Sequence, residues 1–409
     1  MTGSRVRVAV TGLGVRTPAG NQIKEFWETV VAGRSCARTI TAPGFGGLPV
    51  DFACQVSDLS TSAYVTPKQE RRMDRATLLA VCAAADAVSD AGPAHVPPER
   101  RAVVTGTGLA GNETGEATLL GHDGRGDPSA LYVPKVMHNA AAAFISMRHR
   151  LLGPSLTIST ACASGGHAVG EGLRLLREGS ADMVLAGGAE ACVSPTILLA
   201  FHRCGALSQR KAEPERASRP FDTDRDGFVL AEGAAFVVLE RLEDAARRGA
   251  RVYAELAGYG RTSDAYHLTM PDPDGDGAER CIRQALADAR GSAGDVVHVN
   301  AHGSGTPLND ATEAKVIARL FGPGGVPVTS TKSVLGHAIG AAGAIEAVVS
   351  VLTLHERLVP PTINLDSQDP SCEIDVPREP RPLVPGAVVS NSFAFGGHNA
   401  SLVFTPAPS

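Results

Sequence analysis

Short apolar runs and longer amphipathic stretches alternate along the chain, and these two patterns are typical of buried strands and of helices. The apolar runs predict strands at Val6–Val10, Arg101–Val104, Leu156–Ser159, Met183–Ala186, Ala235–Leu239, Val252–Leu256, Val296–Asn300, Val326–Thr329, Val388–Asn391 and Ser401–Phe404. The amphipathic stretches predict helices at Ile23–Ala32, Gln69–Ala91, Ala168–Gly179, Ala278–Arg290, Ala311–Leu320 and Ala342–His355. This alternation predicts an α/β protein with layered helices and sheet.

The pattern begins again near residue 252, where a strand, a long helix and further strands follow each other. We therefore expect two halves, residues 1–251 with the longer insertions and residues 252–409. The sequences of the two halves are too different to identify a repeat. Stretches rich in proline, glycine and aspartate predict loops at Pro271–Gly277, Gly322–Pro327 and Pro377–Gly386.

The composition excludes several classes of function. Of the 409 residues, 43% are hydrophobic and 20% are charged, and a net charge of −5 gives no sign of a nucleic-acid surface. No apolar run reaches the roughly 20 residues of a membrane span, so we expect no membrane partner. The eight cysteines include no C-x-x-C pair and no zinc-ligand spacing. Because no signal peptide precedes the first predicted strand, we expect a cytoplasmic protein with free thiols.

Two kinds of motif, a dinucleotide-binding fingerprint and a calcium-binding loop, are present only in part. The stretch "VTGLGVRTPAG" has Thr17 where a dinucleotide-binding fingerprint needs its third glycine. The stretches "DPDGDG" and "DTDRDG" open like calcium loops, but Arg283 and Gly233 occupy the position of the bidentate glutamate. We interpret both stretches as polar turns.

A cysteine lies at the junction between a predicted strand and a predicted helix. Cys162, in "TACASG", is followed by an amphipathic stretch that contains Leu173 and Leu176. Most single cysteines are small buried residues, and this remains one interpretation. The alternative is a nucleophile, since the positive end of a helix stabilises a thiolate. The helix end alone is too weak for that, so a base or further donors are needed.

Two histidine-containing turns favour the nucleophile. His302 follows an apolar strand in "VHVNAHGSGTPLND", and Lys332 and His337 lie in "TSTKSVLGHAIGAAGAIE". Both turns follow strands and are made of small residues, which predicts a shared cavity at one edge of the sheet. The glycine-rich turn "SNSFAFGGHNA", with Phe393 and Phe395, offers backbone amides for an oxyanion.

Together these motifs resemble the β-ketoacyl-acyl carrier protein synthases of the ketosynthase II type, the condensing enzymes of fatty-acid and type II polyketide synthesis. The motifs are "TACASG", "NAHGSGTPLND", "KSVLGHAIGAAGAIE" and "NSFAFGGHNA", and the likeness extends from "VAVTGLGVRTPAGN" to "NASLVF". The resemblance implies the thiolase fold, in which two similar α/β halves form a five-layer αβαβα sandwich that is normally dimeric.

The resemblance also implies roles for single residues. Cys162 is similar to the acylated nucleophile, and His302 and His337 are similar to the pair that handles decarboxylation of the malonyl extender. Lys332 resembles a supporting lysine beside them, and Glu346 a glutamate behind the site.

Further positions match the substrate-binding part of the family's site. Phe395 looks like the gating phenylalanine, whose backbone N–H would form the oxyanion hole with that of the nucleophile. Ser304 and Thr306 match hydroxyls that touch the pantetheine arm, and Leu109 and Tyr132 fall where the family lines its acyl pocket near the dimer interface.

A basic surface is expected to contact the acidic carrier protein, although a solvated charged face is an alternative interpretation. Its candidate residues are Lys68, Arg71, Arg72 and Arg210.

The implied reaction is a decarboxylative condensation of malonyl-acyl carrier protein with an acyl group held on Cys162. It needs no metal or nucleotide cofactor, because the substrates are carried on phosphopantetheine. The cysteine excludes the chain-length-factor subunits, which lack it, although a heterodimer with such a subunit is as compatible as a homodimer. Histidines at both later positions argue against the His-Asn condensing enzymes and against thiolases.

Ser304, Ala394 and His398 depart from the commoner residues of the family motifs. They favour a specialised role in type II polyketide synthesis, with polyene chains as one product class. The alternatives are housekeeping fatty-acid elongation, a non-catalytic scaffold partner and an acyl-thioester hydrolase.

Overall fold

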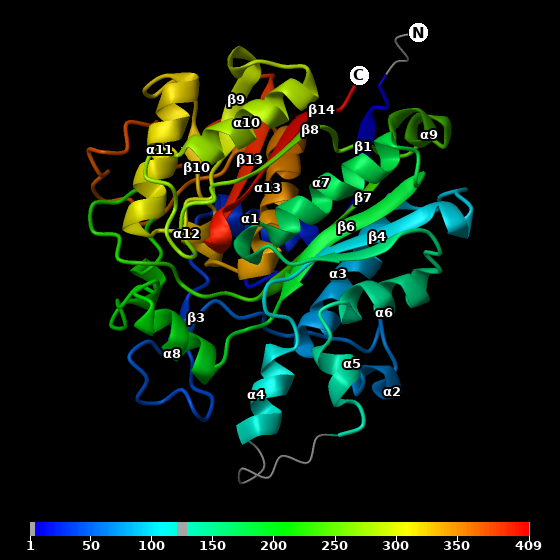
Figure 1. The fold of residues 1–409 in the computed structure, drawn as a ribbon, viewed down its shortest axis with the longest axis horizontal. Coiled ribbons are helices and arrows are strands. Elements are labelled where there is room, and N and C mark those ends of the chain that lie inside the picture. The colour runs from blue at the N-terminus through cyan, green and yellow to red at the C-terminus, as the bar shows by residue number, and fades with distance from the viewer. Residues whose placement is uncertain (1–4, 121–128, 409) are drawn as a thin grey trace.

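A ten-stranded mixed sheet runs through the molecule in the order β10-β9-β13-β14-β8-β1-β7-β6-β4-β5 (Figure 1). The computed structural model describes residues 5–120 and 129–408. The strands are β1 (Val8–Arg16), β4 (Arg101–Gly106), β5 (Ser155–Ile158), β6 (Met183–Glu190), β7 (Gly233–Arg241), β8 (Ala254–Ser263), β9 (Val296–Asn300), β10 (Val328–Thr329), β13 (Ala387–Ala394) and β14 (His398–Pro406). Each of them overlaps one predicted strand, so the predicted α/β class is confirmed.

The same strand order occurs twice in this sheet. On one side β4 pairs in parallel with β5 and β6, and β7 joins β6 and β1 by antiparallel pairing. On the other side β9 pairs in parallel with β10 and β13, and β14 joins β13 and β8 by antiparallel pairing. A short antiparallel contact between β1 and β8 connects the sides. All strands of the first side precede residue 252, whereas a division of the chain into two domains at that residue stays a prediction.

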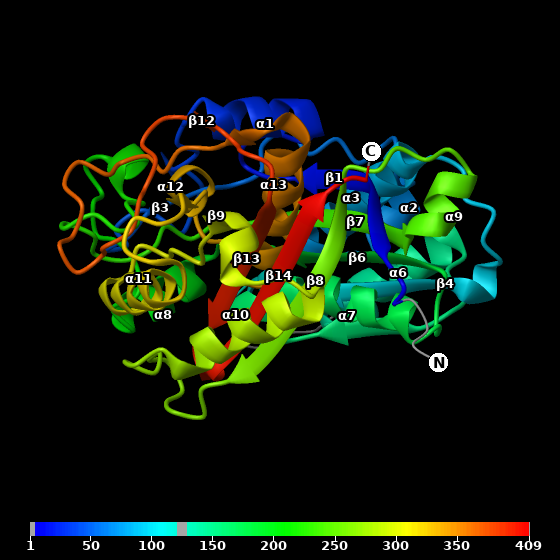
Figure 2. The same ribbon diagram turned by 90° about the horizontal axis from the view of Figure 1, so that it is seen from above.

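Helices form three layers around the two half-sheets (Figure 2). The helices that define these layers are α3 (Arg75–Ala91) and α6 (Ala140–His149) on one outer face, α7 (Ser164–Arg177) and α13 (Ala342–Glu356) between the half-sheets, and α10 (Asp276–Ala289) and α11 (Pro307–Phe321) on the other outer face. The result is the five-layer αβαβα arrangement. Both faces of each half-sheet are covered by helices, which explains why β1 and β6 are buried along their whole length.

The central helix α13 is the most apolar of the chain because sheet surrounds it on two sides. The segment Ile339–Glu356 is long and apolar enough to cross a membrane, with a mean hydropathy of 1.3, but 89% of it is buried inside the protein. Burial to this degree is typical of a core helix.

The remaining elements are short and cover the rim of the sandwich. The helices among them are α1 (Ile23–Val31), α2 (Pro67–Glu70), α4 (Asn112–Leu120), α5 (Tyr132–Val136), α8 (Pro195–Arg203), α9 (Leu242–Arg247) and α12 (Lys332–Leu335). The strands among them are β2 (Arg38–Thr39), β3 (Phe52–Ala53), β11 (Leu358–Val359) and β12 (Arg381–Pro382).

The predicted helix over 69–91 is wrong at its start, because two helices share this segment. Thr66 and Gln69 form a capping box that begins α2, and the Asp74 side chain accepts the Ala76 N–H at 3.0 Å and begins α3. Two N-caps so close together interrupt the amphipathic pattern that suggested one helix.

Candidate active site

The turn after β5 places Cys162 at the start of a central helix. Residues 161–163 form a 3₁₀ turn that leads into α7, and Ala161 takes a positive φ of 49°, which side chains disfavour. The Ser164 hydroxyl accepts the Thr160 N–H at 2.9 Å and donates to the Ala161 carbonyl at 2.7 Å. These bonds hold the strained turn and direct Cys162 toward the C-terminal half-sheet.

Burial dominates the electrostatics of Cys162, which is 8% exposed. Burial raises the pKa of its thiol to about 12, while the charge of Lys332 and the backbone N–H groups of Phe395 and Cys162 oppose this rise. The helix end therefore does not produce a free thiolate. This agrees with the expectation from the sequence that the helix end alone is too weak. For the sulfur to act as a nucleophile, a base must take its proton.

His337 is close enough to take that proton. Its Nε2 atom lies 3.1 Å from the Cys162 Sγ atom. The His337 backbone is fixed by an N–H bond to the Val229 carbonyl at 2.7 Å and by accepting the Ala231 N–H at 3.0 Å. Burial, and then the nearby Lys332, lower the pKa of His337 well below its usual value, so the ring is neutral.

His302 faces His337, with ring centroids 5.3 Å apart. Burial lowers the pKa of His302 well below its usual value, and the positive charge of Lys332 acts in the same direction. The predicted meeting of the two histidine turns is thus realised, with both rings neutral.

Lys332 determines which nitrogen of His302 carries the proton. Its ammonium lies 3.4 Å from His302 Nδ1, donates to the His302 carbonyl at 2.6 Å and forms an ion pair with Glu346. An ammonium group has donors only, so His302 Nδ1 must accept and Nε2 carries the hydrogen. His302 therefore carries its N–H donor on Nε2.

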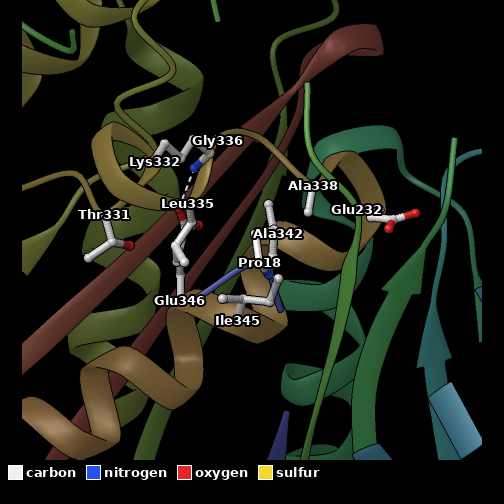
Figure 3. A pocket seen from close by; sticks show the side chains of 10 residues that line it. All are labelled: Pro18, Glu232, Thr331, Lys332, Leu335, Gly336, Ala338, Ala342, Ile345 and Glu346. Carbon is white, nitrogen blue, oxygen red and sulfur yellow. Dashed lines mark hydrogen bonds and ion pairs between the residues drawn. The ribbon is translucent and has the colours of Figure 1, made fainter. Parts of the chain in front are cut away.

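A small cavity of about 10 Å³ lies behind these residues, next to the Lys332–Glu346 pair (Figure 3). Pro18, Thr331 and Ile345 are among its lining residues. Within the described residues, neither the Thr331 hydroxyl nor Glu346 Oε2 has a hydrogen-bond partner. The cavity has room for about one water molecule.

Glu313 supports the His302 turn and was missed by the sequence analysis. Its carboxylate accepts the backbone N–H groups of His302 and Gly303, at 2.9 and 2.8 Å. The Asn391 amide donates to the same carboxylate at 3.3 Å. The signal in the sequence was an acidic residue three positions after Asp310, among the apolar positions of the segment that forms α11.

Phe395 lies at the mouth of the site, directly after β13, and 36% of its surface is exposed. Its backbone N–H and that of Cys162 both interact with the Cys162 sulfur. Two converging amides of this kind are suited to hold an oxyanion. Ser304 and Thr306 lie on the His302 turn with their hydroxyl oxygens 2.9 Å apart.

The other predicted site residues lie further out. Leu109 follows β4, is half-buried and packs against the hydrophobic cluster that contains Cys162. Tyr132 begins α5 and is half-buried. Of the departures from the motifs, Ala394 ends β13 and His398 begins β14.

The candidate basic residues do not form one group within the chain. Lys68, Arg71 and Arg72 are exposed in or directly after α2. Arg210 follows α8, is half-buried and donates to the Asp224 carbonyl at 3.0 Å. The helices α2 and α8 lie on opposite sides in Figures 1 and 2.

Taken together, the site combines a buried thiol, two neutral imidazoles and two converging backbone amides. Such a set can transfer an acyl group to sulfur and stabilise negative charge on two carbonyl oxygens. Among the residues that the structure describes, no three His, Cys, Asp or Glu side chains gather to hold a metal ion.

Family models match both halves of the chain. The model of the beta-ketoacyl synthase N-terminal domain matches residues 5–245, and that of the C-terminal domain matches residues 253–366. The 3-oxoacyl-[acyl-carrier-protein] synthase 2 of Synechocystis sp. is 41% identical over 405 residues, which cover 97% of each chain.

Two solved structures are similar over almost the full length, each with a TM-score of 0.91. One shows a type II PKS acyl-carrier protein in complex with its ketosynthase bound to the hexaketide, with 33% identity and coverage of 99% and 100%. The other is the ishigamide ketosynthase/chain length factor, with 36% identity and the same coverage, 99% and 100%.

Proposed function

Because this chain belongs to the β-ketoacyl synthase family, we propose that it is the catalytic ketosynthase of a type II polyketide system. It is a condensing enzyme with a thiolase-like fold, as the resemblance implied. The reaction joins malonyl-acyl carrier protein to an enzyme-bound acyl group with loss of carbon dioxide. The observation that carries the proposed residue roles is the 3.1 Å contact between His337 Nε2 and Cys162 Sγ.

In the first step Cys162 takes the acyl group. The sulfur attacks the carbonyl of the acyl thioester while His337 Nε2 accepts the thiol proton. The carbonyl oxygen becomes negative and lies against the N–H groups of Cys162 and Phe395. The pantetheine sulfur then leaves and receives the proton from His337, so His337 returns to its neutral form.

In the second step the malonyl thioester loses carbon dioxide. His302 donates its Nε2–H to the malonyl thioester carbonyl, on which enolate charge develops. His337 supplies a second donor in the tautomer that carries hydrogen on Nε2. Since His337 Nδ1 has no hydrogen-bond partner among the described residues, neither tautomer costs a protein contact.

The resulting carbon nucleophile attacks the acyl group on Cys162. Its carbonyl oxygen again becomes negative between the two backbone amides. Collapse of this intermediate breaks the C–S bond, releases β-ketoacyl-acyl carrier protein and leaves a thiolate on Cys162. The thiolate takes one proton from water, which balances the negative charge that the malonyl carboxylate brought in. Ser304 and Thr306 are proposed to hold the pantetheine arm, with Lys332 and Glu346 as support.

The polyketide assignment is the finer part of the proposal, and polyene chains are one product class within it. The similar structures from type II PKS and ishigamide systems support it, as do Ser304, Ala394 and His398. Housekeeping fatty-acid elongation is the second candidate, favoured by the 3-oxoacyl-[acyl-carrier-protein] synthase 2 relatives. The eight free cysteines support a cytoplasmic location.

A dimer is also part of the proposal. β5 is an edge strand that exposes Leu156, and neighbouring α5 and α6 expose Val133, Met137 and Met147. An unpaired edge beside apolar side chains is typical of a pairing surface. A second copy of this chain and a Cys-less chain-length-factor homologue are the two proposed partners.

The test uses purified protein, acyl carrier protein charged with acyl or malonyl groups, and intact-protein mass spectrometry. We expect an acyl adduct on Cys162, a β-ketoacyl product only with malonyl carrier protein, and neither in Cys162→Ala. A scaffold would show no adduct, and an acyl-thioester hydrolase would release free acid without the malonyl substrate. Repeating the assay with a co-expressed Cys-less homologue separates the polyketide from the fatty-acid assignment.

A further inference from the structure

Glu190 is a buried carboxylate that the mechanism above does not use. It ends β6, and none of its surface is exposed. Its donors among the described residues are the backbone N–H groups of Gly108, Leu109 and Gly340, at 2.7, 3.1 and 3.0 Å, and the Thr107 hydroxyl, at 3.3 Å. One side chain thus receives hydrogen bonds from two loops that belong to different halves of the sheet.

The first loop, residues 107–109, connects the nucleophile turn to the expected acyl pocket. The Thr107 N–H donates to the Ile158 carbonyl at 3.0 Å, and the Thr107 carbonyl accepts the Ser164 hydroxyl at 3.2 Å. Leu109 lies at the other end of this loop and packs against the cluster that contains Cys162. Because these bonds join the two segments, a displacement of the loop either displaces the nucleophile turn as well or breaks the bonds between them.

The second loop is the 3₁₀ turn η5 (Ile339–Ala341), which lies shortly after His337. A β-carbon on Gly340 would lie 2.3 Å from the Gly108 nitrogen and 2.7 Å from a Glu190 oxygen. A β-carbon on Gly108 would lie 3.1 Å from Ile339 Cγ2 and from the same carboxylate. The two loops and the carboxylate are thus in direct backbone contact, which only glycine permits.

The charge of Glu190 fits this role. Burial raises the pKa of Glu190 to about 7, and the backbone N–H groups of Gly108, Leu109 and Gly340 oppose the rise. At pH 8 the group is a carboxylate and can accept all of its donors, whereas a neutral side chain of the same size cannot.

We propose that Glu190 is a positioning residue that holds the acyl-pocket loop, residues 107–109, against η5 and so determines which acyl groups reach Cys162. The inference rests on the proposed function, since it takes Cys162 to be the acylated residue. A long acyl chain contacts the wall of the acyl pocket near Leu109 and Ile339 along its length, so this wall must be in place for the chain to bind. A small reagent needs only access to the sulfur.

The variant Glu190→Gln keeps the size of the side chain and removes the charge and one acceptor oxygen. Transfer of acetyl and octanoyl groups from pantetheine thioesters to Cys162 would be followed at pH 8 by intact-protein mass spectrometry. Alkylation of Cys162 by iodoacetamide would be measured in parallel. We expect octanoyl transfer to fall about tenfold or more, since small displacements in a positioned site have effects of this size. Acetyl transfer and alkylation should change little.

Glu240→Gln is the matched control, because Glu240 is a buried carboxylate of β7 that bonds Thr11 and Arg248 away from the site. Its octanoyl-to-acetyl ratio should equal that of the original protein. Glu190→Asp keeps the charge and should shift the octanoyl-to-acetyl ratio less than Glu190→Gln. If Glu190→Gln does not fold, the ratio of Glu190→Asp is compared with that of the original protein instead. An unchanged ratio, or an equal loss in all three measurements, overturns the inference. Absence of acylation in the original protein instead overturns the proposed function.

Discussion

The Nε2 atom of His337 lies 3.1 Å from the Sγ atom of Cys162, although 175 residues separate them in the chain. Cys162 directly follows Ala161, which has a positive φ, and His337 shortly precedes Ile339, which also has a positive φ. Each of these two turns leads into a central helix. The pair therefore forms where the two half-sheets face each other across α7 and α13.

Replacing His337 with alanine should slow acylation of Cys162 about a hundredfold to ten-thousandfold, the usual contribution of a general base. The reason is the raised pKa of the buried thiol, which leaves almost no thiolate at neutral pH without a base. Intact-protein mass spectrometry against time gives the rate. His355→Ala, in the last turn of α13 beside Tyr253, is the control and should acylate normally. Similar rates in both variants would contradict the role of His337.

Replacing Lys332 with methionine should lower the free energy of unfolding by about 3–5 kcal/mol at pH 8, the usual cost of leaving a buried charge without its partner. The charge left behind is that of Glu346, which is 2% exposed. The double variant Lys332→Met, Glu346→Gln should recover part of this loss. Urea unfolding measures all three proteins. An equal loss in the single and double variants would show that the ion pair is not the cause.

His298 should make the protein less stable in mild acid. Burial lowers the pKa of His298 to about 3, whereas the unfolded chain titrates near 6.5, so the unfolded state binds more protons between these values. The contribution of His298 to the free energy of unfolding is therefore fully present above pH 6.5 and decreases as the pH drops below that value. From pH 7 to pH 5 the loss is about 2 kcal/mol.

The variant His298→Gln isolates that loss, since it keeps a polar partner for the Thr329 hydroxyl and does not titrate. Urea unfolding at pH 7 and pH 5 should show a smaller decrease for the variant than for the original protein. Equal decreases would mean that His298 is not buried as a neutral group.

Replacing Leu156 with lysine should convert the proposed dimer to a monomer, because the charge would enter an apolar interface at the β5 edge. Sedimentation velocity gives the oligomeric state. Val384→Lys is the control: Val384 is also exposed, at 62%, but lies outside the β5 region. Dissociation by both variants, or by neither, would argue against pairing through β5.

Reversing the charges of Arg71 and Arg72 should raise the KM for an acyl group on carrier protein and leave small thioester substrates unaffected. Both side chains are exposed after α2, where an acidic partner can reach them. Steady-state kinetics with the two substrate forms makes the comparison. An equal effect on both forms would mean that the arginines act on the fold or the site.

The sequence predicted the strands well because most of them are apolar segments between two helical layers, as β1 and β6 are. It also predicted that the turns of His302 and His337 lie together, since both follow strands and consist of small residues, and the two rings are in contact. The break before α3 was missed because its cause, the cap at Asp74, is one side chain within an otherwise helical pattern.

Glu190 and Glu313 could not be assigned from the sequence for a different reason. Each receives most of its hydrogen bonds from backbone N–H groups of other segments, and a backbone donor leaves no mark in the residue type. The sequence shows only an isolated acidic residue beside apolar neighbours. The distances that give such a residue a role exist only in the folded chain.

The repeated strand order has a consequence for the chain during its synthesis. A ribosome that has completed residue 251 has made Cys162 but neither His302 nor His337. Until residue 337 has been added, the nascent protein lacks the histidine that contacts this thiol in the folded chain. In the proposed mechanism the thiol therefore gains its base late in translation, and a product that ends at residue 251 would carry the cysteine without that base.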